Sequence, residues 1–539
     1  MATRFIVMVA AGLLMGWGVP DARANVFASN VQLNQTSTNL ITDPGDSVTI
    51  HYLLNQNADA GVTVALFNGP VTVWSTNRTG GGAGTLRGTN LIVWNGLGTN
   101  GQVVSNGTWT VRVTAGTVGS TNWTKVPMRN NTPEDRNGDG YVWSPKGIAV
   151  NNNTNSSYFG RVFVGNAGES GLEAEPGDLV GIGKYNADGG YAAEGSFSTG
   201  GWPWAGNDSS PWKVEVGADD RVYVVDGASQ CTVVSFDQII SSNSPQLISL
   251  RTDNMANAAV NYSGIAVTGV GTNRQIYGAD IGNTGPGGVG IRRWSLGAAG
   301  AAATNDPGIT VVSTAPNLSL DLYPQDVAVD SSNRIYTIQD LQPGGPSTNR
   351  VLGYPAFQSN ALTAATWTVT NETLVSAFGI AAALHTNYLG VVCRVDVGNP
   401  INVFNRDTGA AIAVTGLNSG FHDYTDIAWD RAGNLYVSDY LEGRWRVFSP
   451  PGGNQFTTLA LQTIRVGAPL PPTLSQPQWQ SGQFTVNVNG EPGLRYAVDS
   501  STNLVTWSPT TTNLALSAVT PFAIPAPLNK TFFRARIVP

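Results

Sequence analysis

Histidine and cysteine are almost absent from this chain of 539 residues, which holds three histidines and two cysteines. Neither a G-x-S-x-G nucleophile elbow nor an H-E-x-x-H zinc motif is present. The two cysteines, Cys231 and Cys393, fall in distant copies of the repeat described below. We therefore predict two free, mostly buried thiols and no disulfide framework, with little catalytic equipment of the common kinds.

Charge is also scarce, because only 12% of the residues are charged and the formal net charge is −7. Lysine and arginine form no cluster, whereas a basic patch is what nucleic-acid binding requires. We therefore expect no nucleic-acid partner and no attraction to an anionic membrane surface. A mildly acidic surface weakly favours cation binding.

Long apolar runs are missing apart from one at the N-terminus, Phe5–Val19, which follows the basic Arg4. The run is short for a membrane span, and Ala22–Ala24 has the small-x-small form of a cleavage site. We interpret residues 1–24 as a Sec signal peptide. The mature chain is then soluble, has no membrane span, and is secreted to the medium, the periplasm or the cell surface; an uncleaved anchor is the alternative.

Glycine and proline, 64 and 30 residues, are what the chain has in abundance, together with threonine, asparagine and serine. This composition suits many short strands joined by turns, and no later segment has helical apolar spacing. We predict an all-β protein with more than one domain, because a single core rarely grows to this length.

A repeat organises the middle of the chain, and its clearest copy is DIAWDRAGNLYVSDYLEGRWRVFSP, from Asp426 to Pro450. Each copy has an apolar stretch, a polar turn, a second stretch that usually holds an aromatic residue, and a third strand after a loop. The copies align on the first apolar residues Ile148, Val214, Ile265, Val327, Ile380 and Ile427. Four strands recurring at roughly 40–50 residues, with insertions, predict a β-propeller over residues 144–466.

The pattern GIAVD…GNLYVSD…RVxVF resembles NHL-type propeller repeats, and six copies imply six blades. A seventh cryptic blade and a large sandwich are the alternatives. The segment before the repeats, residues 25–118, resembles the immunoglobulin-like domain of the flagellar hook-capping protein FlgD. That resemblance depends on Asn90, Trp94, Asn95, Gly96, Asn100, Gly101, Val104, Gly107, Trp109 and Val113, of which the tryptophans are expected in the core.

We expect a linker at residues 119–143 and a proline-rich linker at residues 467–478. The segment 479–539 alternates as a small β-sandwich and resembles fibronectin-like C-terminal modules of secreted bacterial proteins. The predicted architecture is thus a β-sandwich, a six-bladed β-propeller and a small C-terminal β-sandwich.

The first linker contains DRNGDGYVW, which matches half of a calcium-binding loop. Asp135, Asn137 and Asp139 stand at alternate positions, Gly140 gives the sharp turn, and Tyr141 follows as the position of a backbone ligand. Lys146 stands where such a loop needs glutamate, so the site requires another acid, for example from the insertion that contains Glu169, Glu173, Glu175 and Asp178. A linker turn without metal is the alternative.

A ring of acids forms a second candidate site, at the propeller mouth. The positions near the starts of first strands and the ends of second strands are Asp226, Asp280, Asp326, Asp340, Asp396, Asp426 and Asp439, with Asn166 in the first copy. Calcium-dependent lactonases of the gluconolactonase and paraoxonase type use this layout, and His422 is the one histidine placed as a general base there. The alternatives are turn-capping aspartates and a solvated loop histidine.

Three tryptophans, Trp202, Trp204 and Trp212, form a third candidate as a stacking surface for sugar rings. Their alternative is to fill the junction between blades. We predict a monomeric extracellular binding or scaffold protein for carbohydrate or protein ligands; the scarcity of catalytic residue types favours binding over catalysis, and the sequence leaves an enzymatic activity open. The alternative is a calcium-dependent hydrolase or lactonase with its site at the propeller mouth; a propeller lyase or quinone-dependent dehydrogenase would need histidines or cofactor motifs that we do not find.

Overall fold

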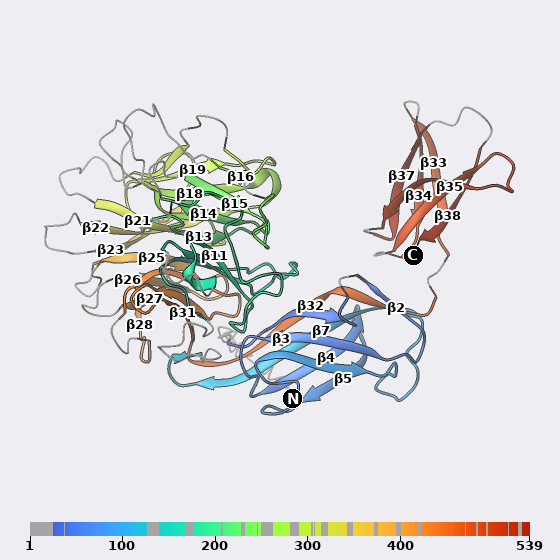
Figure 1. Cartoon of the computed structure of the whole chain (residues 1–539), viewed down its shortest axis with the longest axis horizontal. Coiled ribbons are helices and arrows are strands. Elements are labelled where there is room, and N and C mark those ends of the chain that lie inside the picture. The colour runs from blue at the N-terminus through green and yellow to red at the C-terminus, as the bar shows by residue number, and fades with distance from the viewer. Residues whose placement is uncertain are drawn as a thin grey trace, which may run out of the picture.

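The chain is described by a computed structural model over most of its length. The described residues are 25–36, 38–126, 140–168, 176–205, 209–227, 232–244, 246–248, 262–280, 290–302, 306, 308–313, 322–341, 349–370, 374, 376–394, 400–417, 422–468, 471–480, 483–491, 494–515, 517–525 and 531–538. Strands dominate these residues, which confirms the predicted all-β class. Figure 1 shows a propeller and a small sandwich that adjoin opposite ends of a larger N-terminal sandwich.

The N-terminal sandwich consists of two sheets with the strand orders β1-β3-β6 and β2-β32-β7-β4-β5. Its strands are β1 (Ala28–Leu33), β2 (Leu40–Thr42), β3 (Val48–Leu54), β4 (Gly61–Asn68), β5 (Val71–Arg78), β6 (Gly88–Trp94), β7 (Gly107–Ser120) and β32 (Gly452–Val466). Alternation along β3 buries Val48, Ile50 and Tyr52 between the sheets. Trp94 and Trp109 are buried in the same core, as expected.

One strand of this sandwich, β32, follows the propeller strands in the sequence, whereas the other strands of the sandwich precede them. It pairs with β7 in a long antiparallel ladder, from Gly452 opposite Ser120 to Val466 opposite Gly107. Figure 1 shows β32 in orange among the blue strands. The expected propeller range of 144–466 therefore differs from the observed sheets, because the side chains of Ala460, Ile464 and Val466 belong to the sandwich core. The propeller is inserted where a β7–β32 hairpin would turn.

Six four-stranded sheets make up the propeller within the described residues. The first three blades contain β9 (Pro145–Val150), β10 (Val162–Asn166), β11 (Gly181–Tyr185), β12 (Phe197–Ser198), β13 (Val214–Val216), β14 (Val222–Asp226), β15 (Thr232–Phe236), β16 (Gln246–Leu247), β17 (Tyr262–Thr268), β18 (Gln275–Asp280), β19 (Gly290–Ser295) and β20 (Ile309–Ser313). Two short 3₁₀ turns, Pro176–Asp178 and Gly271–Asn273, lie in their connections.

The other three blades follow in the same order. Their strands are β21 (Leu322–Val329), β22 (Arg334–Leu341), β23 (Arg350–Ala356), β24 (Trp367–Thr370), β25 (Ala377–Ala382), β26 (Tyr388–Cys393), β27 (Ile401–Asn405), β28 (Ala411–Ile412), β29 (Tyr424–Trp429), β30 (Leu435–Asp439), β31 (Arg444–Ser449) and β8 (Thr124–Lys125). Each first strand packs against the next, and β29 of the last blade packs against β9 of the first, so the ring is closed.

Closure depends on β8, which comes from the predicted linker 119–143 and is the outer strand of the last blade. Lys125 pairs with Phe448, and Thr124 pairs with Ser449. Both ends of the propeller thus leave from one blade and continue directly into β7 and β32. The connections are short, residues 121–123 on one side of the insertion and residues 450–451 on the other.

The inner strands approach one another closely at two glycines. A Cβ at Gly147 would lie 2.6 Å from the carbonyl oxygen of Trp212 in the next blade, and one at Gly379 would lie 2.9 Å from Cα of Asp426. No larger residue fits at either place without moving backbone. The small residues in GIAV and FGIA therefore set the width of the axis.

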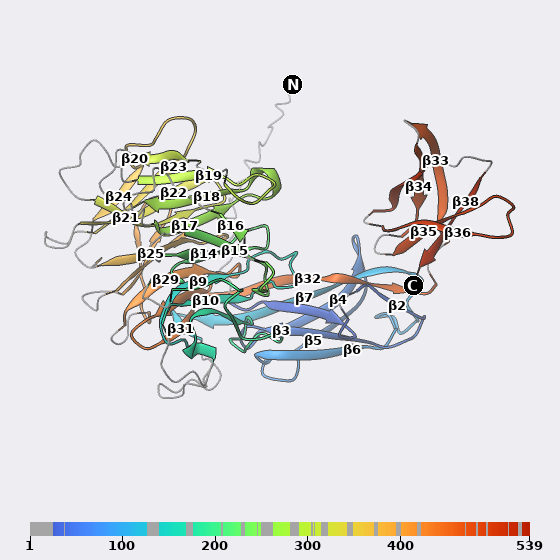
Figure 2. The same cartoon turned by 45° about the horizontal axis from the view of Figure 1, so that its top comes forward.

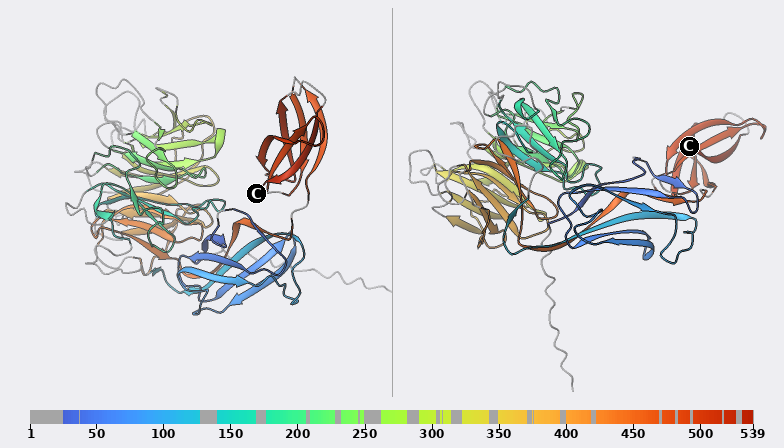
Figure 3. Two further views of the ribbon diagram at one scale, coloured as in Figure 1. Left: turned by 45° about the vertical axis from the view of Figure 1, so that its right-hand side comes forward. Right: turned by 60° about the horizontal axis from the view of Figure 1, so that its bottom comes forward.

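The C-terminal sandwich has the strand orders β33-β34-β37 and β36-β35-β38. Its strands are β33 (Thr473–Gln480), β34 (Gln483–Asn489), β35 (Arg495–Ser501), β36 (Ser508–Leu514), β37 (Val519–Pro525) and β38 (Phe532–Val538). The first of them begins inside the predicted linker 467–478. Figures 2 and 3 show this domain beyond the end of the N-terminal sandwich, to which an ion pair between Arg465 and Glu491 ties it.

Cys393 is a free, buried thiol, and burial raises its pKa to about 12. Cys231 lies outside the described residues, as does the predicted signal peptide. Among the residues that the structure describes, no helix has the length and apolar character needed to span a bilayer.

Candidate functional site

A cavity of about 370 Å³ lies on the propeller axis and is lined by residues of all six first strands. The walls are small and apolar, for example Val150 of β9, Ile265 of β17 and Ile380 of β25. Because first strands run along the axis, the alternation of each strand points every second side chain into this space. An apolar cavity with a few polar groups is the usual form of a small-molecule site.

Three charged side chains in the cavity lining contact one another, and we call them the axial triad: Lys213, Asp326 and Asp426. The Lys213 Nζ lies 2.7 Å from Asp426 Oδ1 and 3.2 Å from Asp326 Oδ2. It also donates to the carbonyl oxygens of Phe378 and Thr425, at 3.0 and 2.9 Å. The three side chains are only 3–7% exposed.

Backbone amides complete the axial triad from other blades. Ile148 N–H donates to Asp426 Oδ2 at 2.9 Å, and Ile380 N–H donates to Asp326 Oδ2 at 3.0 Å. The triad therefore joins the first, second, fourth, fifth and sixth blades across the axis. Because each buried charge has an opposite charge and further hydrogen bonds, its desolvation is compensated.

The pKa values of Asp326 and of its neighbour Glu215 lie above those of ordinary carboxyls, and the pKa of Lys213 lies above that of an ordinary lysine. Burial raises the pKa of Asp326 to about 7, although Lys213 acts to lower it. Burial, and then the charges of Asp426 and Asp326, raise the pKa of the half-buried Glu215 to about 8. Burial acts to lower the pKa of Lys213, but the two aspartates more than offset it. Near neutral pH, Glu215 is therefore a neutral carboxyl that both donates and accepts hydrogen bonds.

Two polar groups of the cavity lining have unused hydrogen-bonding capacity. Asn152 donates from Nδ2 to the carbonyl oxygen of Trp429 at 2.8 Å, but its Oδ1 is buried and has no hydrogen-bond partner among the residues that the structure describes. The guanidinium of Arg431 makes one long bond, 3.4 Å, to the carbonyl oxygen of Asn152, and we find no other for it among the described residues. An unpaired buried acceptor costs free energy unless a ligand or water supplies a donor.

Among the acids predicted at the propeller mouth, those whose side chains the structure describes do not converge on one point. Asp326 and Asp426 meet at Lys213, whereas Asp226 accepts a hydrogen bond from Trp202 Nε1 at 2.9 Å. Asp439 belongs to a separate cluster described next. The side chains of Asp280 and Asp340, and all of Asp396, lie outside the described part of the chain. In the first blade Asn166 accepts from the Ser144 backbone amide, as a turn-capping residue does.

His422, Asp439 and Glu442 form a cluster in the last blade, with ligand atoms within 4.8 Å of one another. His422 Nδ1 lies 2.8 Å from Asp439 Oδ2, and the imidazole stacks on the ring of Tyr424. Arg446 Nε also binds Asp439, at 2.9 Å, and Arg446 pairs with Glu442. The histidine is buried, not a solvated loop residue, and its carboxylate partners already share a cation.

The predicted calcium loop stays a prediction, because Asp135, Asn137 and Asp139 lie outside the described residues. Tyr141, the fourth residue of that prediction, is buried and donates from its hydroxyl to Asp178 Oδ1 at 2.9 Å. Asp178 is the described acid of the neighbouring insertion; Glu169, Glu173 and Glu175 lie outside the described part.

The three predicted tryptophans separate into two places. Trp202 and Trp204 lie edge to face, 6.4 Å between ring centroids, and pack against the core between the first and second blades. Trp212 donates to the carbonyl oxygen of Ser263 at 2.9 Å and contacts Phe378. All three are half-buried and hydrogen-bonded, which fits the junction-filling alternative more closely than a single stacking surface.

Our sequence reasoning missed Lys213, Glu215, Asn152 and Arg431. The stretch KVEV from Lys213 to Val216 did hold a signal, because two charges at alternate positions face the same side of a first strand. The other first strands read GIAV, DVAV, GIAA or DIAW, so a lysine and a glutamate two positions apart mark this one as unusual. Asn152 and Arg431 lie in turns after first strands, where the sequence offers no comparable signal.

Comparisons with known proteins identify no family for the chain. No family model matches it, and no curated protein matches it. Two solved structures from Trichoderma reesei, titled iodide and calcium structures of carbohydrate-active enzymes family AA12, are 12% identical and align over 62% of this chain and 97% and 96% of theirs, with TM-scores of 0.39 and 0.38.

A third structure, dimeric latent PorU from Porphyromonas gingivalis, is 7% identical and aligns over 96% of this chain and 32% of its own, with a TM-score of 0.12. Such low TM-scores carry no argument about fold or function. The resemblances to FlgD-type, NHL-type and fibronectin-like families stay predictions.

Proposed function

We propose that the protein is an extracellular carbohydrate-binding protein and that the axial cavity is its saccharide site. The observation that carries the proposal is the buried Asn152 Oδ1 without a partner, on the wall of a cavity that also holds Arg431. A ligand there must donate to the asparagine oxygen and accept from the guanidinium. Sugar hydroxyls do both, and Glu215, neutral near pH 7, matches them because it also does both.

Binding is favoured over the hydrolase alternative by the state of the axial triad. A metal-dependent hydrolase at this place needs carboxylate oxygens that are free to bind the ion. Here both aspartates bind the Lys213 ammonium and backbone amides, so an ion on the axis would have to displace the lysine. The hydrogen-bonding capacity of the triad is thus used within the protein, whereas Asn152 and Arg431 in the same lining have capacity left.

The proposal is tested by calorimetric titration of the mature protein with a panel of neutral mono- and disaccharides and their uronic acids. We expect saturable binding of at least one sugar, and a loss of about tenfold in affinity in Asn152→Ala and in Arg431→Ala, since each removes one buried hydrogen bond. Asn155→Ala is the matched control, because Asn155 is exposed in the same loop and does not line the cavity.

Two results would overturn the proposal. One is the absence of binding across the panel at millimolar sugar. The other is binding that Asn152→Ala and Arg431→Ala leave unchanged, because the sugar would then occupy another place.

A further inference from the structure

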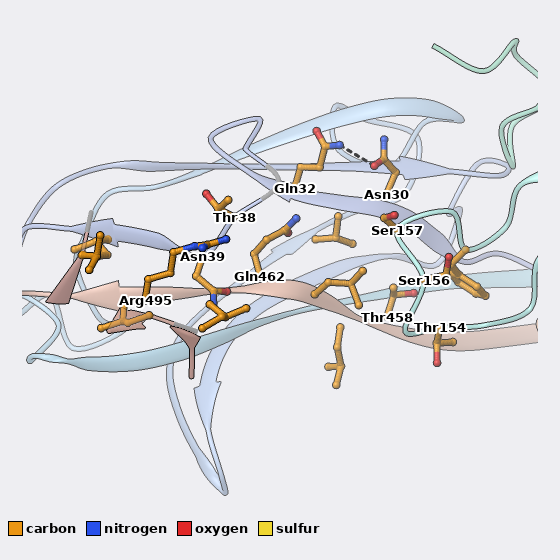
Figure 4. A pocket seen from close by; sticks show the side chains of 18 of the residues that line it. Asn30, Gln32, Thr38, Asn39, Thr154, Ser156, Ser157, Thr458, Gln462 and Arg495 are labelled. Carbon is orange, nitrogen blue, oxygen red and sulfur yellow. Dashed lines mark hydrogen bonds between the residues drawn. The ribbon is translucent and has the colours of Figure 1, made fainter. Parts of the chain in front are cut away.

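A second and larger cavity, of about 720 Å³, lies where the three domains meet (Figure 4). We call it the junction pocket. The N-terminal sandwich lines it with β1, β2 and β32, the propeller with the loop around Ser156, and the C-terminal sandwich with residues of β35, β36 and β38. It shares no residue with the axial cavity. Ligand sites occur preferentially at such domain interfaces.

Aliphatic side chains that are unusually exposed line the junction pocket. Ile41, Leu459, Leu461 and Leu514 are 44–48% exposed. Leu459 and Leu461 are both exposed in β32, whereas Ala460 between them is buried, so both leucines project away from the sandwich core. Four such side chains gathered from two domains form an apolar surface of the kind that marks an interaction site.

The polar groups of the pocket match a ligand that has both a hydrogen-bond donor and a negative charge. Gln462 Oε1 is buried and has no hydrogen-bond partner in the described part of the chain. Arg495 is exposed at the start of β35, and among the described residues we find no side chain or carbonyl bound to its guanidinium. Among the described residues of the lining it is the one that carries a charge, and none of them is an acid. Figure 4 shows Arg495 extending toward Asn39, and Gln462 extending from β32 into the same space.

We propose that the junction pocket binds an extended aliphatic peptide that ends in a free carboxylate, supplied by a partner protein. Backbone N–H groups of a peptide provide the donor that Gln462 Oε1 lacks, and its carboxylate complements Arg495. Aliphatic side chains at alternate positions of the peptide cover Leu459 and Leu461. An ionised fatty acid has no donor for Gln462, and a saccharide has no aliphatic side chains, so a peptide satisfies the pocket more fully than either.

The probe for this proposal is the peptide Ser-Thr-Val-Leu-Val-Leu, labelled with fluorescein at its N-terminus and followed by fluorescence anisotropy with the full mature chain. We expect saturable binding. Arg495→Ala should weaken it about tenfold, as should the same peptide with an amidated C-terminus, since each removes the charge-assisted contact. The amidated peptide should bind Arg495→Ala no more weakly than it binds the unaltered protein, because the pair is then already broken.

Leu461→Asp should abolish peptide binding by placing a charge in the aliphatic surface. Val505→Asp is its matched control, because Val505 is 81% exposed in the same C-terminal domain and lies outside the pocket. Arg431→Ala should leave peptide binding unchanged, as Arg495→Ala should leave saccharide binding unchanged, so the two sites fail independently.

The proposal is overturned if the peptide does not bind at about 1 mM, a weak-affinity limit, or if Leu461→Asp and Val505→Asp bind it equally. It is overturned as well if decanoate or a neutral oligosaccharide saturates the junction pocket while the peptide does not. Either ligand would be recognised by loss of its binding in Leu461→Asp.

Discussion

The axial cavity and the junction pocket differ in the kinds of side chain that line them. The axial cavity lies within one domain, and its lining includes a triad of buried charges in which every member has partners from other blades. The junction pocket lies between three domains, and neutral amides, hydroxyls and aliphatic side chains line it around the single charge of Arg495. The charged groups of the axial cavity also stabilise the propeller, whereas the junction pocket is a surface between domains.

This difference separates the two roles that a polar group can have in a site. A charge that is buried with several partners positions the elements from which they come, so its removal should first be felt as lost stability. A buried polar group with no partner costs free energy on folding and is available to a ligand. Stability and binding should therefore respond to different residues, and each prediction below tests that separation.

The largest effect is expected from Lys213→Met. Removal of the ammonium leaves two buried carboxylates without their cation, and breaking such a pair typically costs about 3–5 kcal/mol. We expect the free energy of unfolding of the propeller to fall by about that amount. Calorimetric melting measures it, with the propeller transition assigned by hydrogen exchange of the inner strands.

The triple variant Lys213→Met, Asp326→Asn, Asp426→Asn is the matched test, because it removes the orphaned charges and should regain much of the loss. Arg495→Ala, in the junction pocket, should change the same transition by less than about 0.5 kcal/mol. A Lys213→Met protein as stable as the unaltered one would show that the triad does not hold the blades together.

The second prediction concerns pH. The pKa of Asp326 is raised to about 7 and that of Glu215 to about 8 in the folded protein. Because each group binds its proton more tightly when folded, stability falls as pH rises from the unfolded carboxyl pKa toward the folded one, and it levels off above that. We expect the propeller to melt at a lower temperature at pH 8 than at pH 5.

Glu215→Gln should flatten this dependence, because glutamine keeps the neutral form at every pH. Peptide binding in the junction pocket should not follow the same curve, since no acid lines that pocket. A pH profile of melting that Glu215→Gln leaves unaltered would assign the dependence to other groups.

Much of the fold could be predicted because each blade carries its own copy of the signal. Polar turns such as DRAGN, and alternation on both sides of them, recur six times, and local patterns of this kind determine local hairpins. The partners of β8 and β32 could not be predicted in this way. Alternation tells which face of a strand is buried, but not which sheet the strand joins when its partner is hundreds of residues away.

The residues of the candidate site could likewise be predicted where the repeat carries them, and could not be predicted where they depend on distant parts of the chain. Asp326 and Asp426 were selected because they recur at one position of the repeat, and the structure does bring them together. Their partner Lys213 occurs in one copy alone, so its place among them depends on ring closure, which no single repeat encodes. Asn152 and Arg431 could not be predicted at all, because what marks them is hydrogen-bonding capacity that the described residues leave unused.

The smallest expected effect has the opposite sign and tests the role of an unpartnered group directly. Gln462→Met keeps the length of the side chain and removes a carboxamide whose buried oxygen has no partner, so we expect the protein to become slightly more stable, by about 1 kcal/mol. The same change should weaken peptide binding, because the acceptor in the junction pocket is gone. Calorimetry and anisotropy on one variant measure both quantities. If Gln462→Met loses stability and binding together, the carboxamide has a partner in the folded chain, and the separation of stabilising groups from binding groups fails at the pocket where it should be clearest.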